Sequence, residues 1–267
     1  MSETFTFGYF AHEESTQEAS ERLRQWMSSR LGVPMKLQFA GGYEALAREV
    51  EAGSVDLAWL PPVVFVKVRP GAAEPLVSLL RGRAKGYQSV LVVRADSSIH
   101  RLKDLRNTRA AWVDAWSASG FVVPRVGLSS LGIDPRTLFR VEAFHGSHGA
   151  ATRAVVDGAA DVTGTHARLK EAGDEGVEGP WALVDGVAMR VLQSFGAVPS
   201  DLICTRPDLP AEEKKALHDA FIAAAEGPMK AEVKAIFGAD AFAEGSATGY
   251  DDLRKELEKA TKAGLFD

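Results

Sequence analysis

Two serines, Ser117 and Ser119, stand in a short turn whose chemistry suits an anion. The turn follows an apolar strand pattern at 111–113 and precedes a helical pattern through 122–128. Serine hydroxyls donate hydrogen bonds, and the first backbone N–H groups of a helix, here from Ala118 to Gly120, have no intrahelical acceptor. The helix dipole adds partial positive charge at the same end. The turn therefore predicts an exposed oxyanion site that needs neither lysine nor metal, with a ligand-free serine N-cap as the alternative.

Further polar and aromatic residues are candidates for the same chemistry. His148 follows Gly146-Ser147 and opens a helical pattern, so its ring can donate to an anion or help to cap the helix. Tyr43 and Tyr87 are either packing residues or hydroxyl donors on an aromatic body. His145 lies near His148, but two histidines without a third ligand are weak evidence for a metal. We expect neither a metal nor a cofactor.

Motifs of nucleophilic and metal-dependent catalysis are missing from the sequence. It contains no Gly-x-Ser-x-Gly elbow, no Gly-x-x-x-x-Gly-Lys phosphate loop and no His-Glu-x-x-His pair. Ser117, His148 and Asp201 can be combined into a triad on paper, yet the same residues equally suit the surroundings of an oxyanion. The sequence therefore argues against nucleophilic and metal-dependent catalysis of these kinds.

Strand and helix patterns alternate along the chain and must position these residues. A β-α-β-α-β order with short connections predicts a parallel sheet with helices on its faces. In the first part the strands are expected at 4–10, 35–39 and 55–60, and the helices at 15–31 and 43–53. Later strands are expected at 89–93, 109–113, 139–142, 160–162 and from 202, and helices at 149–157, from 210 and at 251–263.

Composition places the chain among ordinary globular proteins. Its 267 residues are 46% hydrophobic and 25% charged, which argues against a disordered or fibrous protein. Its 31 basic and 36 acidic residues give a net charge of -5 and form no basic cluster, which argues against nucleic acid as a partner. No stretch approaches a membrane span. The single cysteine, Cys204, lies in a buried-strand pattern and is expected in the core.

A short sequence pattern that occurs twice indicates two similar lobes. Each copy reads helix, glycine, and then a small residue and an aspartate entering a strand: once at Gly53 to Asp56 and again at Gly158 to Asp161. We interpret both aspartates as strand-entry residues rather than catalytic acids.

Short motifs in a particular order carry a family resemblance over nearly the whole chain. They are Gly41-Gly42-Tyr43-Glu44-Ala45-Leu46, Gly53-Ser54-Val55-Asp56-Leu57-Ala58, Gly86-Tyr87-Gln88-Ser89, Ser97-Ser98-Ile99 with Leu102, Asp104 and Leu105, Ser117-Ala118-Ser119-Gly120-Phe121 with Pro124 and Arg125, Gly146-Ser147-His148, Val155 with Gly158 and Asp161, and Val198-Pro199-Ser200-Asp201-Leu202. On these motifs the chain resembles substrate-binding proteins of the phosphonate, phosphite and phosphate branch of ABC-type importers.

The resemblance implies a two-lobed α/β protein of the type II periplasmic-binding fold. Each lobe would be a mostly parallel sheet flanked by helices, with a small oxyanion held between the lobes and hinge closure around it. Residues 1–90 and 203–267 would form lobe I, and residues 91–202 lobe II. Strands at 90–94 and 202–206 would form the hinge.

Site residues follow from the resemblance position by position. Ser117, Ser119 and the N–H groups of 118–121 would hold the phosphonate oxygens, and His148 would donate a further bond. Tyr43 and Tyr87 would close over the oxyanion from the other lobe, and Asp201 would face the organic substituent. Apart from the resemblance, Trp116 is a candidate to line the cleft, with a place in the core as the alternative.

Two positions depart from the family pattern. Ala118 stands where the family usually has threonine, which removes one hydroxyl donor. Arg168 stands near the position at which aminoalkylphosphonate binders place a carboxylate for the ligand ammonium. The basic residue indicates a more anionic or smaller ligand, although a solvated Arg168 without such a role is the alternative.

Partners and location also follow from the resemblance. It implies an ABC permease as partner if the chain is exported, a periplasmic location, and a monomer. Met1 leads directly into the first strand with no signal peptide, so a cytoplasmic chain is also considered. A cytoplasmic enzyme on the same fold and a ligand-sensing module of a regulator are the alternative functions.

Overall fold

The chain folds into two compact units in a computed structural model that describes residues 3–10, 14–81, 86–169, 177–184 and 187–266. Unit 1 comprises residues 1–86 and 199–251, and unit 2 comprises 87–198 and 252–267. The sequence placed the C-terminal residues with lobe I. Residues 252–267 instead group with unit 2, where the carbonyl oxygen of Leu265 accepts a hydrogen bond of 2.6 Å from Nε of Arg125.

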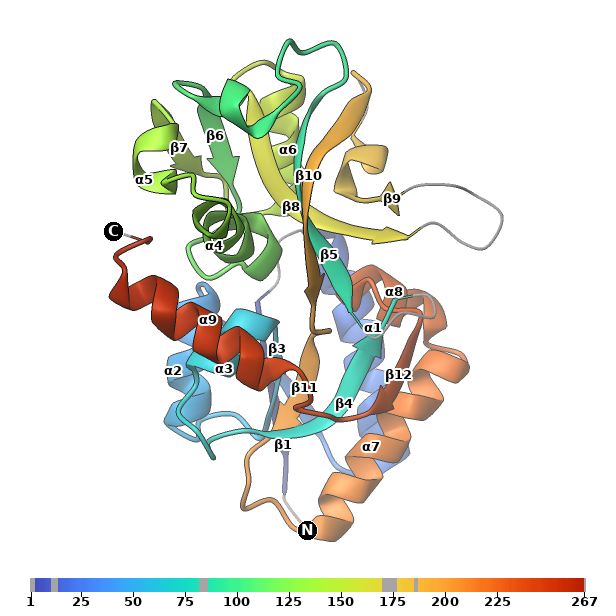
Figure 1. Ribbon diagram of the computed structural model, residues 1–267. Coiled ribbons are helices and arrows are strands. Elements are labelled where there is room, and N and C mark those ends of the chain that lie inside the picture. Colours follow the sequence, from blue (N-terminus) through green and yellow to red (C-terminus); the bar gives the residue numbers. More distant parts are fainter. Residues whose placement is uncertain (1–2, 11–13, 82–85, 170–176, 185–186, 267) are drawn as a thin grey trace. The chain divides into compact units, whose positions relative to one another are not determined.

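Unit 1 is built on a mixed sheet (Figure 1). In spatial order its strands are β12 (Ala241–Glu244), β4 (Glu74–Leu80), β11 (Leu202–Thr205), β3 (Leu57–Leu60), β1 (Phe5–Tyr9) and β2 (Met35–Phe39). Strands β2, β1 and β3 are parallel, as predicted, whereas β11, β4 and β12 pair antiparallel. The helices are α1 (Glu14–Leu31), α2 (Tyr43–Glu51), α3 (Pro62–Lys67), α7 (Ala211–Glu226), α8 (Lys230–Phe237) and the start of α9 (Tyr250–Lys262).

Aromatic side chains form the centre of the unit 1 core. Phe7 of β1 packs against Phe221 of α7 and Phe237 of α8, with ring centroids 5.9 and 6.3 Å apart. Met27 of α1 and Leu217 of α7 are fully buried in the same cluster. Burying each of these large side chains contributes about 1.5–3 kcal/mol, so this cluster holds α1, α7 and α8 together with the sheet.

Unit 2 repeats the same plan with a second mixed sheet. Its strands, in spatial order, are β10 (Met189–Val198), β5 (Tyr87–Arg94), β8 (Val162–Leu169), β6 (Arg109–Trp112) and β7 (Val141–Phe144), and β9 (Val177–Glu178) pairs with β8. Its helices are the 3₁₀ turns η1 (Leu102–Leu105) and η3 (Pro180–Leu183), the π-helix η2 (Ala118–Val122), α4 (Val123–Ser130), α5 (Pro135–Leu138) and α6 (His148–Val156). The strand expected at 89–93 is β5, which lies between β10 and β8.

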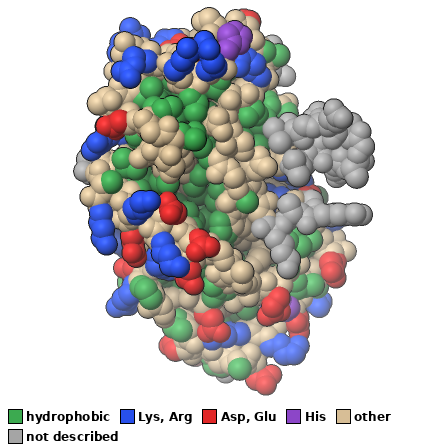
Figure 2. Space-filling model, in the orientation of Figure 1, with side chains coloured by type: hydrophobic (Ala, Val, Ile, Leu, Met, Phe, Trp, Pro, Cys, Tyr) green, Lys and Arg blue, Asp and Glu red, His purple; other side chains and the backbone are tan. Residues whose placement is uncertain are grey.

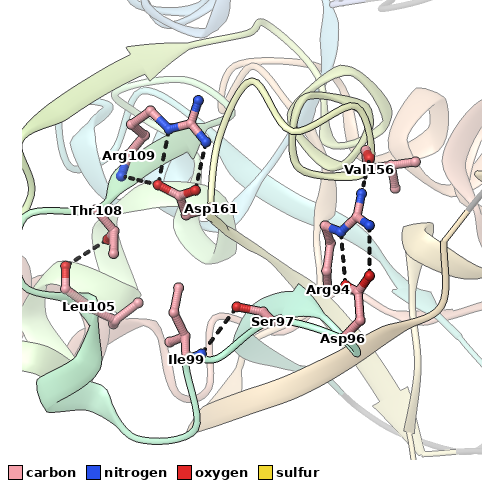
Figure 3. Close-up of polar contacts among 9 residues, drawn as sticks. All are labelled: Arg94, Asp96, Ser97, Ile99, Leu105, Thr108, Arg109, Val156 and Asp161. Atoms are coloured by element: carbon pink, nitrogen blue, oxygen red, sulfur yellow. Dashed lines mark hydrogen bonds and ion pairs between the residues drawn. The ribbon is translucent and has the colours of Figure 1, made fainter.

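The recurring aspartates have the same structural role in both units. Asp161 accepts from the backbone N–H of Arg109 and from its guanidinium, and returns its own N–H to the Arg109 carbonyl (Figure 3). Asp56 makes the same backbone exchange with Thr6 and accepts from Arg206. Each aspartate thus ties the starts of two parallel strands together, which confirms that both are strand-entry residues.

Several elements differ from the sequence prediction for identifiable reasons. The run from Pro62 to Lys67, for which the sequence predicted no element, is helix α3, and Pro62 is well placed in its first turn. Strand β4 was not predicted. Neither was β10, whose pairing with β5 has register shifts between Val191 and Gln193 and between Ser194 and Ala197. Such shifts interrupt the two-residue alternation that reveals a strand.

Two further expectations concern burial and the membrane. Cys204 lies in β11 with 1% of its surface exposed, and burial raises the pKa of its thiol. This confirms its expected place in the core. Among the described helices, none has the combined length and apolar character that crossing a bilayer requires.

Candidate functional site

The serine turn begins where strand β6 ends. The carboxylate of Asp114 accepts a 2.7 Å hydrogen bond from the N–H of Trp116, and the Asp114 carbonyl accepts one from the N–H of Ser117. The hydroxyl of Ser117 then caps the next helical turn, since it accepts from the N–H of Gly120 at 3.1 Å. The helix that follows starts as the π-helix η2 and continues as α4. Local turn chemistry therefore fixes the backbone of the turn.

Not every donor in this turn is available to a ligand. The N–H groups of Gly120 and Phe121 bond within the turn, to the hydroxyl and the carbonyl of Ser117. The N–H groups of Ala118 and Ser119 have no acceptor among the described residues, and neither does the Ser119 hydroxyl proton. The turn thus presents fewer backbone donors than the sequence predicted, and these lie on two consecutive residues.

Burial of the turn corrects another expectation. Ser117 and Ser119 are 4% and 2% exposed, so they do not lie at an exposed helix start. Donors in a site of low dielectric interact more strongly with a charge than donors in water. The Ser119 hydroxyl is not among the enclosed side-chain atoms that lack a hydrogen-bond partner, so it can meet solvent or a ligand.

Two glycines allow the turn to lie against the sheet. A Cβ on Gly164 of β8 would lie 3.0 Å from the Trp112 ring, 3.1 Å from Pro124 and 3.2 Å from the backbone carbon of Gly120. A Cβ on Gly120 would collide with Val113. The Ser89 hydroxyl of β5 donates to the Ser119 carbonyl at 3.2 Å. The turn is therefore held on strands β5 and β8.

His148 reaches the same part of strand β8. It is the first residue of α6, and the preceding Ser147 caps that helix by accepting from the N–H of Ala150. Its Nδ1 lies 2.8 Å from the hydroxyl oxygen of Thr165, next to Gly164. The serine turn and His148 thus contact consecutive residues of β8, Gly164 and Thr165, whose side-chain directions lie on opposite faces of the strand.

An aromatic chain links His148 to Tyr87. The His148 ring packs edge to face against His166, with centroids 4.6 Å apart, and His166 packs likewise against Tyr87 at 6.1 Å. Tyr87 is the first residue of β5 and is partly exposed. It belongs to unit 2, the unit of the serine turn, and not to the other lobe as the sequence predicted. Four predicted site positions, Ser117, Ser119, His148 and Tyr87, therefore belong to one connected region of unit 2.

Tyr43 and Asp201 belong to unit 1. Tyr43 is the first residue of α2, and its ring packs edge to face against Phe10, 5.3 Å away. Asp201 has 5% of its surface exposed. Its carboxylate accepts hydrogen bonds from Nη2 of Arg81 at 2.7 Å and from Nε1 of Trp59 at 3.2 Å. Within unit 1 this carboxylate is already an ion-pair partner, which the sequence did not predict.

Arg168 also has a partner that the sequence did not indicate. Its Nε lies 2.7 Å from a carboxylate oxygen of Glu178, its register partner across β8 and β9. The two side chains are 35% and 40% exposed, so the pair is accessible to solvent. The positive charge of Arg168 is thus compensated by an adjacent acid. Trp116, the other selectivity candidate, is partly exposed in the serine turn.

Sequence reasoning missed the strand residues behind the site. Ser89 on β5 and Thr163 and Thr165 on β8 are fully buried hydroxyl residues, and Ser89 pairs in register with His166. The alternation Thr-x-Thr at 163–165 was a usable signal, because residues two apart share one face of a strand. It was overlooked because β8 was predicted to end at residue 162.

Basic and acidic side chains are interspersed over much of the face in Figure 2. The described residues contain no group of three or more His, Cys, Asp or Glu side chains that could hold a metal.

Two curated relatives are similar to the chain. It is 31% identical over 138 residues to the phosphate-import protein PhnD of Mycolicibacterium smegmatis, a match that covers 49% of this chain and 43% of the relative. It is 26% identical over 223 residues to the phosphonates-binding periplasmic protein of Escherichia coli, covering 78% of this chain and 63% of the relative. The chain thus spans less than two thirds of the length of either protein.

Solved structures extend the similarity to the fold. PhnD1 from Prochlorococcus marinus (MIT 9301), solved in complex with methylphosphonate, matches with a TM-score of 0.77 at 19% identity and covers 97% of this chain and 99% of that one. The α/β class and the type II periplasmic-binding fold are thereby confirmed, although each sheet is mixed rather than mostly parallel. A family model described as "ABC transporter, phosphonate, periplasmic substrate-binding protein" matches residues 7–250. The chain therefore belongs to the family of periplasmic substrate-binding proteins of phosphonate ABC transporters.

Proposed function

We propose that the chain is a non-enzymatic binding protein that captures a small oxyanion, a phosphonate, phosphite or related phosphate compound, for an ABC-type importer. The observation that carries the proposal is the buried serine turn of unit 2. Its Ala118 and Ser119 N–H groups and its Ser119 hydroxyl lack an acceptor among the described residues. Family membership supplies the ligand class and the transport role.

Capture works by replacing the water shell of the anion with fixed donors. Hydrogen bonds to a charged group are roughly twice as strong as neutral ones. Ser117 and Ser119, the N–H groups of Ala118 and Ser119, and His148 together supply about five donors, enough for a dissociation constant of about 1 μM or lower. The donors are held before the ligand arrives, because the strands and the Ser117 cap fix the turn.

The remaining predicted contacts have different degrees of support. Tyr87 is supported by the ring contacts that connect it through His166 to His148. Tyr43 rests on the resemblance alone. Asp201 has less support as a contact to the ligand substituent, since its carboxylate already accepts from Arg81 and Trp59.

Two substitutions separate the possible roles of Asp201, which are to pair with Arg81 and to contact the ligand. Removing one partner of a buried ion pair costs about 3–5 kcal/mol, so Arg81→Ala should lower the free energy of unfolding by an amount in that range. If Asp201 also contacts the ligand, Asp201→Asn should weaken binding of an ammonium-bearing ligand more than binding of methylphosphonate. Equal weakening of both would leave Asp201 a structural role only.

Substituent selectivity is proposed to depend on the pair of Arg168 and Glu178. Arg168 should disfavour an ammonium-bearing ligand by like-charge repulsion, and Glu178 reduces that repulsion because it lies 2.7 Å away. We expect phosphite, methylphosphonate or a carboxylated phosphonate to bind more tightly than aminoethylphosphonate. Arg168→Glu should raise the affinity for aminoethylphosphonate and Glu178→Gln should lower it. Tightest binding of aminoethylphosphonate by the wild type would contradict the charge argument.

Partner, location and oligomeric state are part of the same proposal. An ABC permease would receive the ligand, the protein would act in the periplasm, and it would act as a monomer. Co-purification with the permease encoded in the same genomic neighbourhood tests the first point, and the elution volume in size-exclusion chromatography tests the last.

One experiment tests the binding function directly. Isothermal titration calorimetry with phosphate, phosphite, sulfate, methylphosphonate and aminoethylphosphonate should show saturable 1:1 binding for at least one phosphorus oxyanion. The ligand should be recovered unchanged after prolonged incubation, since no turnover is proposed. Absence of binding to every compound, or conversion of any of them, would refute the proposal.

A further inference from the structure

We propose that Thr165 is a positioning residue that holds neutral His148 with its proton on Nε2. The hydroxyl oxygen of Thr165 lies 2.8 Å from Nδ1 of His148. Thr165 sits on β8 and none of its surface is exposed. The assignment of the tautomer does not depend on the proposed function. Its consequence, that Nε2–H donates to the oxyanion, does rest on the proposed function.

The direction of this hydrogen bond follows from the hydroxyl proton. Within the described residues, the imidazole of His148 is the one hydrogen-bonding partner of the Thr165 hydroxyl. If Nδ1 carried the histidine proton, it would donate to Thr165, and the buried hydroxyl proton would point at no acceptor. A buried donor without an acceptor bears its full desolvation penalty. If Nδ1 is unprotonated, the hydroxyl donates to it and the proton is satisfied.

Ring packing holds His148 in the orientation that this bond requires. The His166 ring lies against it at an interplanar angle of 81°, with a centroid distance of 4.6 Å. Thr165 and His166 are consecutive on β8, so one short stretch of strand both orients the His148 ring and selects its tautomer. The N-terminus of α6, capped by Ser147, fixes the backbone from which the ring projects.

The consequence for recognition concerns the kind of ligand atom that His148 can meet. A neutral imidazole with its proton on Nε2 is a donor at that atom and not an acceptor. His148 would therefore favour an unprotonated ligand oxygen over a P–OH group. Together with the N–H groups of Ala118 and Ser119, it would complete a set made of donors alone.

The tautomer is measurable in the protein without any ligand. Imidazole ¹⁵N resonances report which ring nitrogen carries the proton, and recording them at alkaline pH keeps the ring neutral. His148→Gln identifies the His148 signals among those of the six histidines. Thr165→Val removes the hydroxyl with little change of shape, Thr165→Ser keeps it, and Thr163→Val is the matched control. Thr163 is equally buried on the same strand, but its hydroxyl donates to the Gly164 carbonyl.

We expect wild type, Thr165→Ser and Thr163→Val to show His148 protonated on Nε2, and Thr165→Val to show a mixture of tautomers. Predominant protonation of Nδ1 in the wild type would overturn the proposal, and so would an unchanged spectrum in Thr165→Val. For the best-binding oxyanion, Thr165→Val should weaken affinity by about two- to tenfold more than Thr163→Val. Equal losses in both variants would refute the consequence for recognition. If the wild type binds no oxyanion, the proposed function fails while the spectra still decide the tautomer.

Discussion

The two serines of the turn should respond differently to replacement by alanine, although they are two residues apart. The Ser117 hydroxyl accepts a hydrogen bond from the N–H of Gly120 at 3.1 Å, whereas the Ser119 hydroxyl has no partner among the described residues. Ser119→Ala should therefore remove a ligand contact and leave the fold unaffected. Ser117→Ala should remove a ligand contact and a helix cap together.

The magnitudes follow from these contacts. Loss of a donor to a charged group costs about 1.5–3 kcal/mol, so each variant should bind the oxyanion about 10- to 150-fold more weakly. The double variant should lose at least about a hundredfold. Loss of an N-cap costs about 0.5–2 kcal/mol. For a chain of this length, that lowers Tm by about 1–8 °C in Ser117→Ala, and Ser119→Ala should stay within about 2 °C of the wild type.

Two measurements on the same samples separate these effects. Calorimetry gives the dissociation constant for the oxyanion that the wild type binds best, and thermal unfolding without ligand gives Tm. Ser129→Ala is a suitable control, since Ser129 lies on α4, away from the turn. Unchanged affinity in Ser119→Ala would remove this hydroxyl from the site. An unchanged Tm in Ser117→Ala would show that the cap contributes little to stability.

Three further predictions concern the scaffold. Gly164→Ala places a methyl group 3.0 Å from the Trp112 ring. This overpacking should lower the free energy of unfolding in urea by about 1–3 kcal/mol and weaken oxyanion binding, because it displaces the turn. Unaltered binding would mean that the turn does not depend on this close approach. Hydrogen bonds from Arg109 lower the pKa of Asp161 in the folded state. The resulting stabilisation is present above the unfolded pKa of about 3.9 and is lost as pH falls through the lower folded pKa. If wild type and Asp161→Asn still differ in free energy of unfolding well below the folded pKa, the pair of Arg109 and Asp161 is not the source of the stabilisation. Burial raises the pKa of Cys204, so a thiol reagent should label it only in denaturant, and rapid labelling of the native protein would show that β11 opens.

Local patterns were sufficient to predict the framework of the site. Strand alternation and helical periodicity located β1, α1, β2, α2 and α6, since these signals depend on residues a few positions apart. The serine turn was recognisable for the same reason. Each of its contacts, from the two to Asp114 to the Ser117 cap, joins residues at most three positions apart. The sequence pattern that runs from glycine to aspartate occurs twice and also predicted two lobes. In the structure, both aspartates tie the starts of two strands together.

Only the tertiary structure decided how the polar groups of the site are paired. Asp201 meets Arg81, 120 residues away in sequence, and Thr165 meets His148, 17 residues away. Composition and spacing do not reveal such partners, because they depend on which strands become neighbours. The same holds for burial: the predicted exposed turn lies buried on β5 and β8, where Gly164 admits it. The sequence by itself determined which donors exist, and long-range packing determined which of them are left for a ligand.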